Sequence, residues 1–148
     1  MPAASPAAPS AAVVDLATSL DRVFAWMRRH RPPTSYSMTA LTTLARLADD
    51  GPARISDLAR LEGVTQPAMT GLVNRLEGED MVRRAADPRD ARAALVGLTA
   101  TGQVWIVERR AERARLLAAE LERLPADDLA VLLAAHPALD RLAGASAV

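Results

Sequence analysis

The segment from position 65 to position 76 combines hydrogen-bonding side chains with an absence of acids. Its positions outside the apolar pattern are Thr65, Gln66, Ala68, Thr70, Gly71, Asn74 and Arg75, and the first acidic residue is Glu77. Such a surface can exchange hydrogen bonds with the edges of DNA bases without repelling phosphate. For any one of these residues, the alternative is an ordinary solvated position. As predicted DNA contacts we select Thr65, Gln66, Ala68, Thr70, Asn74 and Arg75.

Arginines gather in the segment that follows. Between positions 83 and 92, four arginines stand against two aspartates, which leaves a local charge of +2. The spacings Asp87-x-Arg89 and Asp90-x-Arg92 predict ion pairs that stiffen a loop and leave one arginine to enter a narrow minor groove. A solvated charged turn is the alternative. The predicted DNA contacts here are Arg84, Asp87, Arg89 and Arg92.

The hydrophobic pattern around these side chains predicts the helices and strands that position them. Two short helical patterns, residues 56–61 and 66–76, flank a tight turn with Gly63 and a helix-capping Thr65, which is typical of a helix-turn-helix. Strand-like runs at 81–85 and 93–98 follow, joined by an Asp-Pro turn, and they predict a β-hairpin. Residues 54–99 are therefore predicted to form a winged helix-turn-helix.

Amphipathic helices are predicted on both sides of this module. One runs from Val13 to before Pro32, one begins at Ser37, a long one follows Thr99, and one begins at Pro125. Pro137 is expected to kink or break the last helix. The Ala, Pro and Ser composition of residues 1–12 predicts a disordered tail.

Composition limits the classes of function. Half of the 148 residues are hydrophobic and only four are aromatic, which favours a mainly helical fold of one domain. Eighteen arginines balance eighteen acids, so attraction to a polyanion must come from a local patch. The absence of cysteine and the presence of only two histidines predict no enzyme, no metal and no cofactor. Without an apolar run of membrane-spanning length, we expect a cytoplasmic protein with no membrane partner.

The motifs together resemble one known family. The run Thr65–Leu76, followed by Met81–Arg84, Asp87–Arg92 and Leu98–Gly102, resembles the MarR (multiple antibiotic resistance regulator) family over residues 13–143. The resemblance implies an α+β fold, mainly α with a small β-hairpin wing. It implies a single domain over 13–148, with dimerisation helices at 13–36 and 100–148 around a winged helix-turn-helix at 37–99.

The resemblance also implies a function. Members are homodimers, usually repressors, that bind double-stranded DNA at a pseudo-palindromic operator, and several are released by a small, often anionic aromatic effector. By this analogy Arg89 enters the minor groove, while Asp87 and Arg92 fix the wing. Trp26, Tyr36 and Arg46 are the implied ligand-pocket residues. A winged helix used only for protein contact is the alternative function.

Three positions depart from the family pattern. Asp80 stands where a glycine usually closes the reading helix, and Asp tolerates the left-handed conformation that this turn requires. Arg54 stands where a capping threonine is common, and we expect it to contact the DNA backbone. Gly71 replaces a side chain that often reaches DNA, which predicts fewer contacts to bases.

Overall fold

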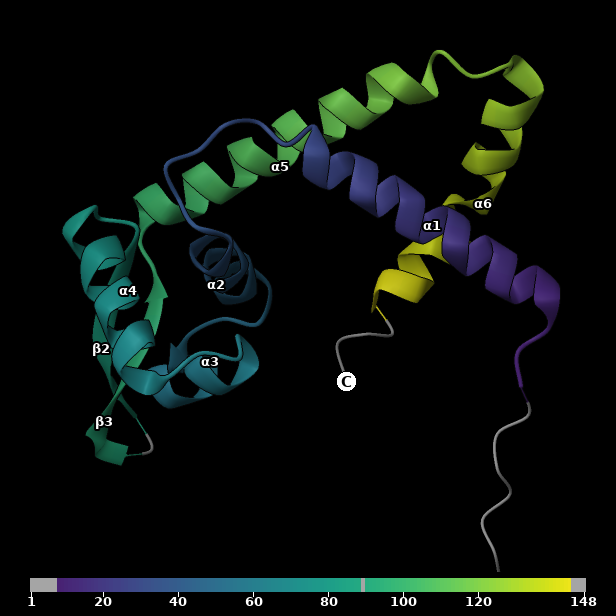
Figure 1. Ribbon diagram of the computed structural model, residues 1–148. Helices are drawn as coiled ribbons and strands as arrows, with labels where there is room; N and C mark the ends of the chain where they lie inside the picture. The colour runs from purple at the N-terminus through teal and green to yellow at the C-terminus, as the bar shows by residue number, and fades with distance from the viewer. Residues whose placement is uncertain (1–7, 89, 145–148) are drawn as a thin grey trace, which may run out of the picture. The chain divides into compact units, whose positions relative to one another are not determined.

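Helices make up most of the described chain, as the scarcity of aromatic residues predicts. The structure is a computed structural model that describes residues 8–88 and 90–144, without the side chains of 90–93 (Figure 1). In chain order the elements are α1 (Ala11–Arg29), α2 (Met38–Asp49), β1 (Ala53–Arg54), α3 (Ile55–Leu61), α4 (Gln66–Gly78), β2 (Val82–Asp87), β3 (Asp90–Leu98), α5 (Ala100–Leu121) and α6 (Ala126–Gly144). Among the described residues, no helix has the length and apolar character needed to cross a membrane.

The elements divide between two compact units. One unit combines Met1–Pro32 with Arg113–Val148, and the other is Pro33–Glu112. The second unit contains the whole predicted winged helix-turn-helix, residues 37–99, and the first half of α5.

The helix-turn-helix consists of α3 and α4, as predicted. Gly63 adopts the left-handed conformation in the turn, with φ at 65°. The hydroxyl of Thr65 accepts a hydrogen bond from the Ala68 N–H at 3.4 Å and so caps α4. Pro67 lies in the first turn of α4, where backbone N–H groups have no partner within the helix, so proline costs no hydrogen bond there. The predicted start of the second helix of the helix-turn-helix is therefore confirmed.

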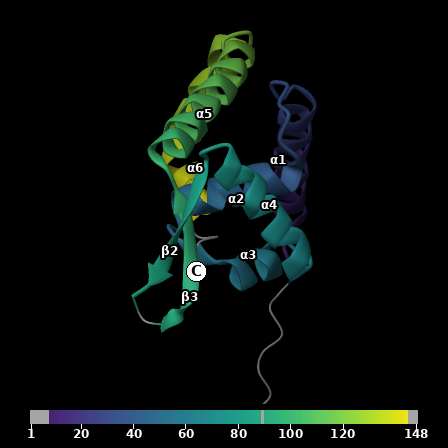
Figure 2. The ribbon, with the colours of Figure 1, turned by 90° about the vertical axis from the view of Figure 1, so that its left-hand side faces the viewer.

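The wing is a hairpin within a three-stranded antiparallel sheet of order β1-β3-β2. Strands β2 and β3 pair from Val82 opposite Leu98 to Asp87 opposite Asp90, and Figure 2 shows this hairpin projecting beside α3. The third strand, β1, pairs Ala53 with Val96. Sequence alternation did not predict β1, because two residues are too few to show a period of two.

The hydrophobic core lies in the second unit. Its fully buried large side chains include Leu44 of α2, Leu58 of α3, Met69, Val73 and Leu76 of α4, Val82 of β2 and Val96 of β3. Burying one such side chain stabilises the fold by about 1.5–3 kcal/mol. The core thus fixes one face of α4 against the other elements and leaves its opposite face toward solvent.

The end of α4 is joined to the start of α5. Asp80 has a φ of 56°, which confirms the left-handed turn predicted without glycine. Thr99 caps α5 by accepting from the Gly102 N–H at 3.0 Å, and its own N–H donates to the Met81 carbonyl at 3.1 Å. Thr101 donates its hydroxyl to the Asp80 carboxylate at 2.7 Å. The hairpin is therefore closed by contacts between its two ends.

Two helix boundaries differ from the sequence prediction. α1 begins at Ala11 with Ser10 at its N-cap, so helix includes the last two residues of the predicted tail. α6 is one element from Ala126 to Gly144 with Pro137 inside it, so of the two expected effects of Pro137, a kink or a break, the break does not occur. Proline lacks one backbone donor, but the remaining hydrogen bonds on both sides can maintain the helix.

The first unit exposes most of its apolar side chains. Within the described residues, neither α1 nor α6 contains a buried residue. Its large exposed hydrophobic side chains are Val13, Val14, Leu16, Val23 and Phe24 of α1, Leu116 and Leu124, and Val131, Leu132, Leu133, Leu139 and Leu142 of α6. An apolar surface of this extent is typical of an interaction site rather than of solvent-facing helices.

Candidate nucleic-acid interface

The candidate interface begins with the outer face of α4. Its inner face is buried through Met69, Leu72, Val73 and Leu76, at the three-to-four spacing of one helical side. The six predicted contacts lie on the remaining surface: Thr65, Gln66, Ala68, Asn74 and Arg75 are exposed and Thr70 is partly buried. At Gly71 an added Cβ would meet nothing within 4 Å, so this face is open to an approaching groove.

Hydrogen bonds already orient part of this face. Thr70 donates its hydroxyl to the Gln66 carbonyl at 2.9 Å. Arg84 of β2 donates from Nη2 to the Asn74 Oδ1 at 2.6 Å, and its Nη1 forms an ion pair with the Glu77 carboxylate. Glu77 is the only acid of α4, so its charge is balanced by a wing arginine. Arg84, predicted as a DNA contact, therefore lies against α4.

A second ion pair holds the outer end of β2, next to the loop of the wing. Arg54 at the start of α3 donates from Nε at 2.9 Å and from Nη2 at 2.6 Å to the same Asp87 oxygen. The Asp87 side chain is only 7% exposed, whereas that of Arg54 is 40% exposed. Arg89, the predicted partner of Asp87, lies outside the described residues. The side chain of Arg92 lies outside them as well.

A hollow runs along one edge of α4. It has a volume of about 310 Å³ and is lined by Ser37, Thr39, Val64, Ala68, Met69, Gly71, Leu72 and Arg75. Ser37 is the N-cap of α2, and its hydroxyl accepts from the Ala40 N–H at 3.2 Å. A helix N-terminus beside a guanidinium is an electrostatically favourable place for an anion.

Tyr36 connects the segment before α2 to the end of α4. Its ring packs edge-on against Trp105 with 5.1 Å between centroids, and the Arg109 guanidinium lies 5.3 Å from the Trp105 ring centre. Burial, then a hydrogen bond to Glu79 and the charge of Glu79, raise the pKa of Tyr36 to about 12, while Arg75 has an opposing effect. The phenol therefore stays protonated well above neutral pH.

This shift predicts a pH dependence. Because the folded-state pKa of about 12 exceeds the ordinary value of 10.0, the contribution of Tyr36 to stability is complete below pH 10.0 and is lost as the pH rises toward 12. Tyr36 is the only tyrosine, so ultraviolet titration of tyrosinate reports this group alone. We expect the native chain to ionise near pH 12 and the urea-unfolded chain near pH 10.0. Native ionisation at the lower pH would contradict the packing described here.

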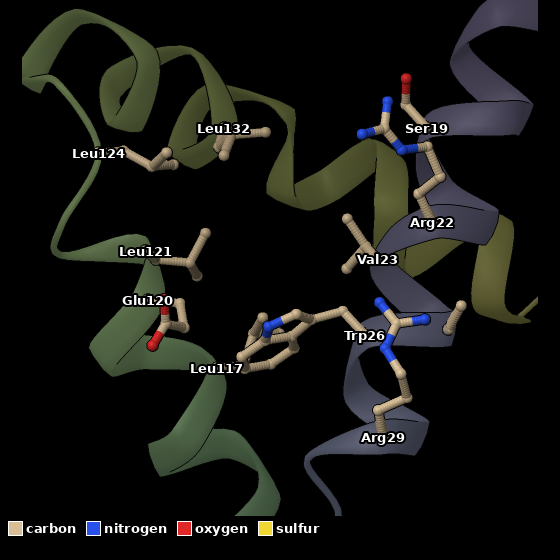
Figure 3. A pocket seen from close by; sticks show the side chains of 11 residues that line it. Ser19, Arg22, Val23, Trp26, Arg29, Leu117, Glu120, Leu121, Leu124 and Leu132 are labelled. Atoms are coloured by element: carbon tan, nitrogen blue, oxygen red, sulfur yellow. The ribbon is translucent and has the colours of Figure 1, made fainter.

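The three predicted ligand-pocket residues have different surroundings. Trp26 lines a pocket of about 690 Å³ in the first unit, where Figure 3 shows its indole projecting toward Leu117. Arg46 forms ion pairs with Glu62 at 3.1 Å and with Asp50 at 3.5 Å. Tyr36 packs against Trp105 as above. Among the described residues, no group of three His, Cys, Asp or Glu side chains could hold a metal.

Sequence reasoning missed the partners of several site residues. Glu77 was noted only as the acid that ends the polar face, and Trp105 was not selected at all. Glu77 and Arg84 are seven residues apart in the sequence and lie on opposite sides of a turn, so neither helical nor strand periodicity predicts that they meet. Only the folded hairpin brings them together. The one available signal was the opposite charge of Glu77 and the arginines that follow it.

Comparison with known proteins identifies the family. The MarR family model matches residues 36–94. An uncharacterized HTH-type transcriptional regulator of Mycobacterium bovis is 30% identical over 121 residues, which cover 82% of this chain and 85% of that protein. This chain belongs to the MarR family. It is therefore a helix-turn-helix transcriptional regulator of a DNA-binding family and not an enzyme.

Other relatives agree with this assignment to the MarR family. The HTH-type transcriptional repressor NicR of Pseudomonas putida is 37% identical over 60 residues, 40% of this chain and 38% of that protein. The structure of a transcriptional regulator from Thermotoga maritima matches with a TM-score of 0.64 and 26% identity, over 74% of this chain and 78% of that one. A MarR family protein from Bacillus stearothermophilus shares the fold, with a TM-score of 0.65 and 21% identity over 93% and 99% of the two chains.

Proposed function

We propose that this MarR-family chain binds a pseudo-palindromic DNA operator as a homodimer and represses transcription. The observation that carries the proposal is the outer face of α4, which is exposed, polar and without an unpaired acid among its described side chains. A second helix of this kind fits the major groove of B-DNA, where base pairs present distinct hydrogen-bonding patterns. The name of the relative NicR supports repression rather than activation.

Each group of predicted contacts has a place in this proposal. On α4, the contacts are Thr65, Gln66, Ala68, Thr70, Asn74 and Arg75. Arg75 borders the hollow beside the N-terminus of α2, which suits a backbone phosphate. Arg89 enters the minor groove, and the ion pair of Arg54 with Asp87 holds the wing that carries it. Arg84 and Arg92 complete the wing, and Arg54 lies where it can also approach the DNA backbone.

The homodimer is proposed from the exposed apolar side chains of the first unit. Two-fold symmetry matches a pseudo-palindromic operator, because each subunit then contacts one half-site. A second copy of the chain would remove the apolar surface of α1 and α6 from water, which is favourable in proportion to the area buried. The dimerisation helices would be those of residues 13–36 and 100–148.

A small aromatic or anionic effector is a further part of the proposal. The pocket around Trp26 is also lined by Arg22, Arg29 and Glu120 (Figure 3), so it offers an indole ring and two guanidinium groups against one carboxylate. Aromatic stacking and charge-assisted hydrogen bonds would both favour an aromatic carboxylate. Tyr36 and Arg46 remain additional candidates for contact with the effector.

The proposal predicts salt-dependent binding that depends on Arg89. Fluorescence anisotropy with the DNA upstream of the chain's own gene should show tight binding that weakens steeply with salt. We expect Arg89→Ala to reduce affinity about tenfold and to lower the slope of log affinity against log salt by about 1 per wing. Arg115→Ala, at an exposed arginine of α5 outside the winged helix, should change neither quantity.

Two results would contradict the proposal. Binding that does not respond to salt would exclude a phosphate-directed mechanism. A complete absence of binding to any duplex, with the chain folded, would favour the alternative of a winged helix that contacts only proteins.

A further inference from the structure

The orientation of Asn74 on α4 is set by the wing and not by the helix itself. Its Oδ1 accepts a hydrogen bond from the Arg84 Nη2 at 2.6 Å, although Asn74 is exposed. A guanidinium has only donors, so the amide atom that faces it must be the carbonyl oxygen. The amide NH₂ of Asn74 therefore remains as the group available to DNA.

Arg84 is itself held in place. Its backbone N–H donates to the Glu77 Oε1 at 3.1 Å, and its Nη1 pairs with the other oxygen of the same carboxylate. The Arg84 side chain is only 30% exposed. Glu77 thus positions Arg84 through two contacts, and Arg84 in turn positions Asn74.

The two helix neighbours of Asn74 on its N-terminal side leave its amide exposed, and the Glu77 carboxylate on its C-terminal side is paired with Arg84. The positions three and four residues earlier are Gly71, with no side chain, and Thr70, whose hydroxyl proton is used by the Gln66 carbonyl. These positions share a side of the helix with Asn74, because residues three and four apart are neighbours on a helix surface. The middle of the outer face of α4 therefore presents the NH₂ group of Asn74 as a hydrogen-bond donor.

Resting on the proposed DNA-binding function, we propose that Asn74 is a specificity-determining residue that selects guanine over adenine at one base pair of each half-site. Guanine presents two adjacent acceptors in the major groove, N7 and O6, which both attract an NH₂ donor. Adenine presents N7 beside an N6 amino donor, and its usual bidentate pairing with asparagine needs a free amide oxygen. In this protein Arg84 takes one of the two lone pairs of that oxygen and fixes the plane of the amide against the wing, which disfavours the bidentate pairing with adenine.

The test is selection of duplexes from a random library by the full-length chain, followed by affinity measurements on single-base variants. Wild type should prefer guanine to adenine about tenfold at the base pair that Asn74 contacts. Asn74→Ala should bind both bases equally at that pair and leave the other positions unchanged. Replacing the guanine with 7-deazaguanine should weaken wild type and leave Asn74→Ala unaffected.

A second variant tests the role of Arg84 directly. Arg84→Met keeps most of the apolar stem but donates no hydrogen bond, so it frees the Asn74 oxygen to accept from adenine N6. We expect the preference at this one pair to move from guanine toward adenine. The ratio of the two affinities is the readout, because a general loss of affinity or stability leaves that ratio unchanged.

Each outcome decides the inference. An adenine preference in wild type, or equal weakening on all sequences in Asn74→Ala, would overturn the role of Asn74. An unchanged guanine preference in a folded Arg84→Met would overturn the positioning by Arg84. If wild type enriched no duplex at all, the proposed DNA-binding function itself would be wrong. That result can be distinguished from selection of duplexes that carry adenine instead of guanine at this base pair, which would contradict only the role of Asn74.

Discussion

Gly102→Ala is expected to destabilise the winged helix by about 3 kcal/mol or more, at the upper end of overpacking costs. A Cβ at Gly102 would lie 2.1 Å from the Met81 carbonyl oxygen and 3.2 Å from the Leu98 Cδ2. The backbone has little room to yield, because the Thr99 N–H bonds the same carbonyl and the Thr99 hydroxyl bonds the Gly102 N–H. Urea unfolding followed by circular dichroism measures the loss.

The same substitution at Gly71 is the matched control. Both glycines are helical, but an added Cβ at Gly71 meets nothing within 4 Å. Gly71→Ala should therefore raise the free energy of unfolding by about 0.5–1 kcal/mol, since alanine loses less backbone entropy than glycine in a helix. If both variants unfolded at the same urea concentration, the close approach of α5 to Met81 would be wrong.

Features that depend on neighbouring residues were predictable from the sequence. The capping roles of Ser37, Thr65 and Thr99 follow from their position before apolar periodic runs, and the left-handed Asp80 was expected from the glycine that the family usually has at that position. Features that depend on contacts between residues far apart in the sequence could not be predicted from the sequence. Strand β1 exists only because β3 pairs with it, and the continuity of α6 through Pro137 is not determined by local propensity.

The candidate site shows the same division. Periodicity correctly placed Gln66, Asn74 and Arg75 on the outer face of α4, because burial of one helix face determines which residues the other presents. Charge alone could not assign partners to the arginines. Arg54 and Asp87 are 33 residues apart, and their contact exists only after the hairpin folds against α3. Distinguishing an arginine that supports the site from one that contacts DNA therefore requires the folded structure.

Phe24→Asp should convert the proposed homodimer into a monomer. Phe24 is 59% exposed within the apolar surface of α1, so a second copy that covers this surface would bury the introduced carboxylate. Burying an unpaired charge is far more costly than one apolar contact is favourable. Sedimentation at micromolar concentration should show a dimer for wild type and a monomer for the variant. Operator affinity should fall about a hundredfold or more, because the two half-sites are no longer bound by one linked pair of helices.

Thr18→Asp is the control for this variant. Thr18 is also exposed on α1 but lies with Asp15 and Arg22 at the spacing of its polar side, so the new charge stays in water and the dimer should persist. A Phe24→Asp variant that remained a dimer would show that α1 is not in the interface. Because the substitution lies outside the winged helix, the monomer should still bind a single half-site weakly and with salt dependence. Loss of that residual binding would mean that the first unit supports the fold of the DNA-binding unit as well as the association of the two subunits.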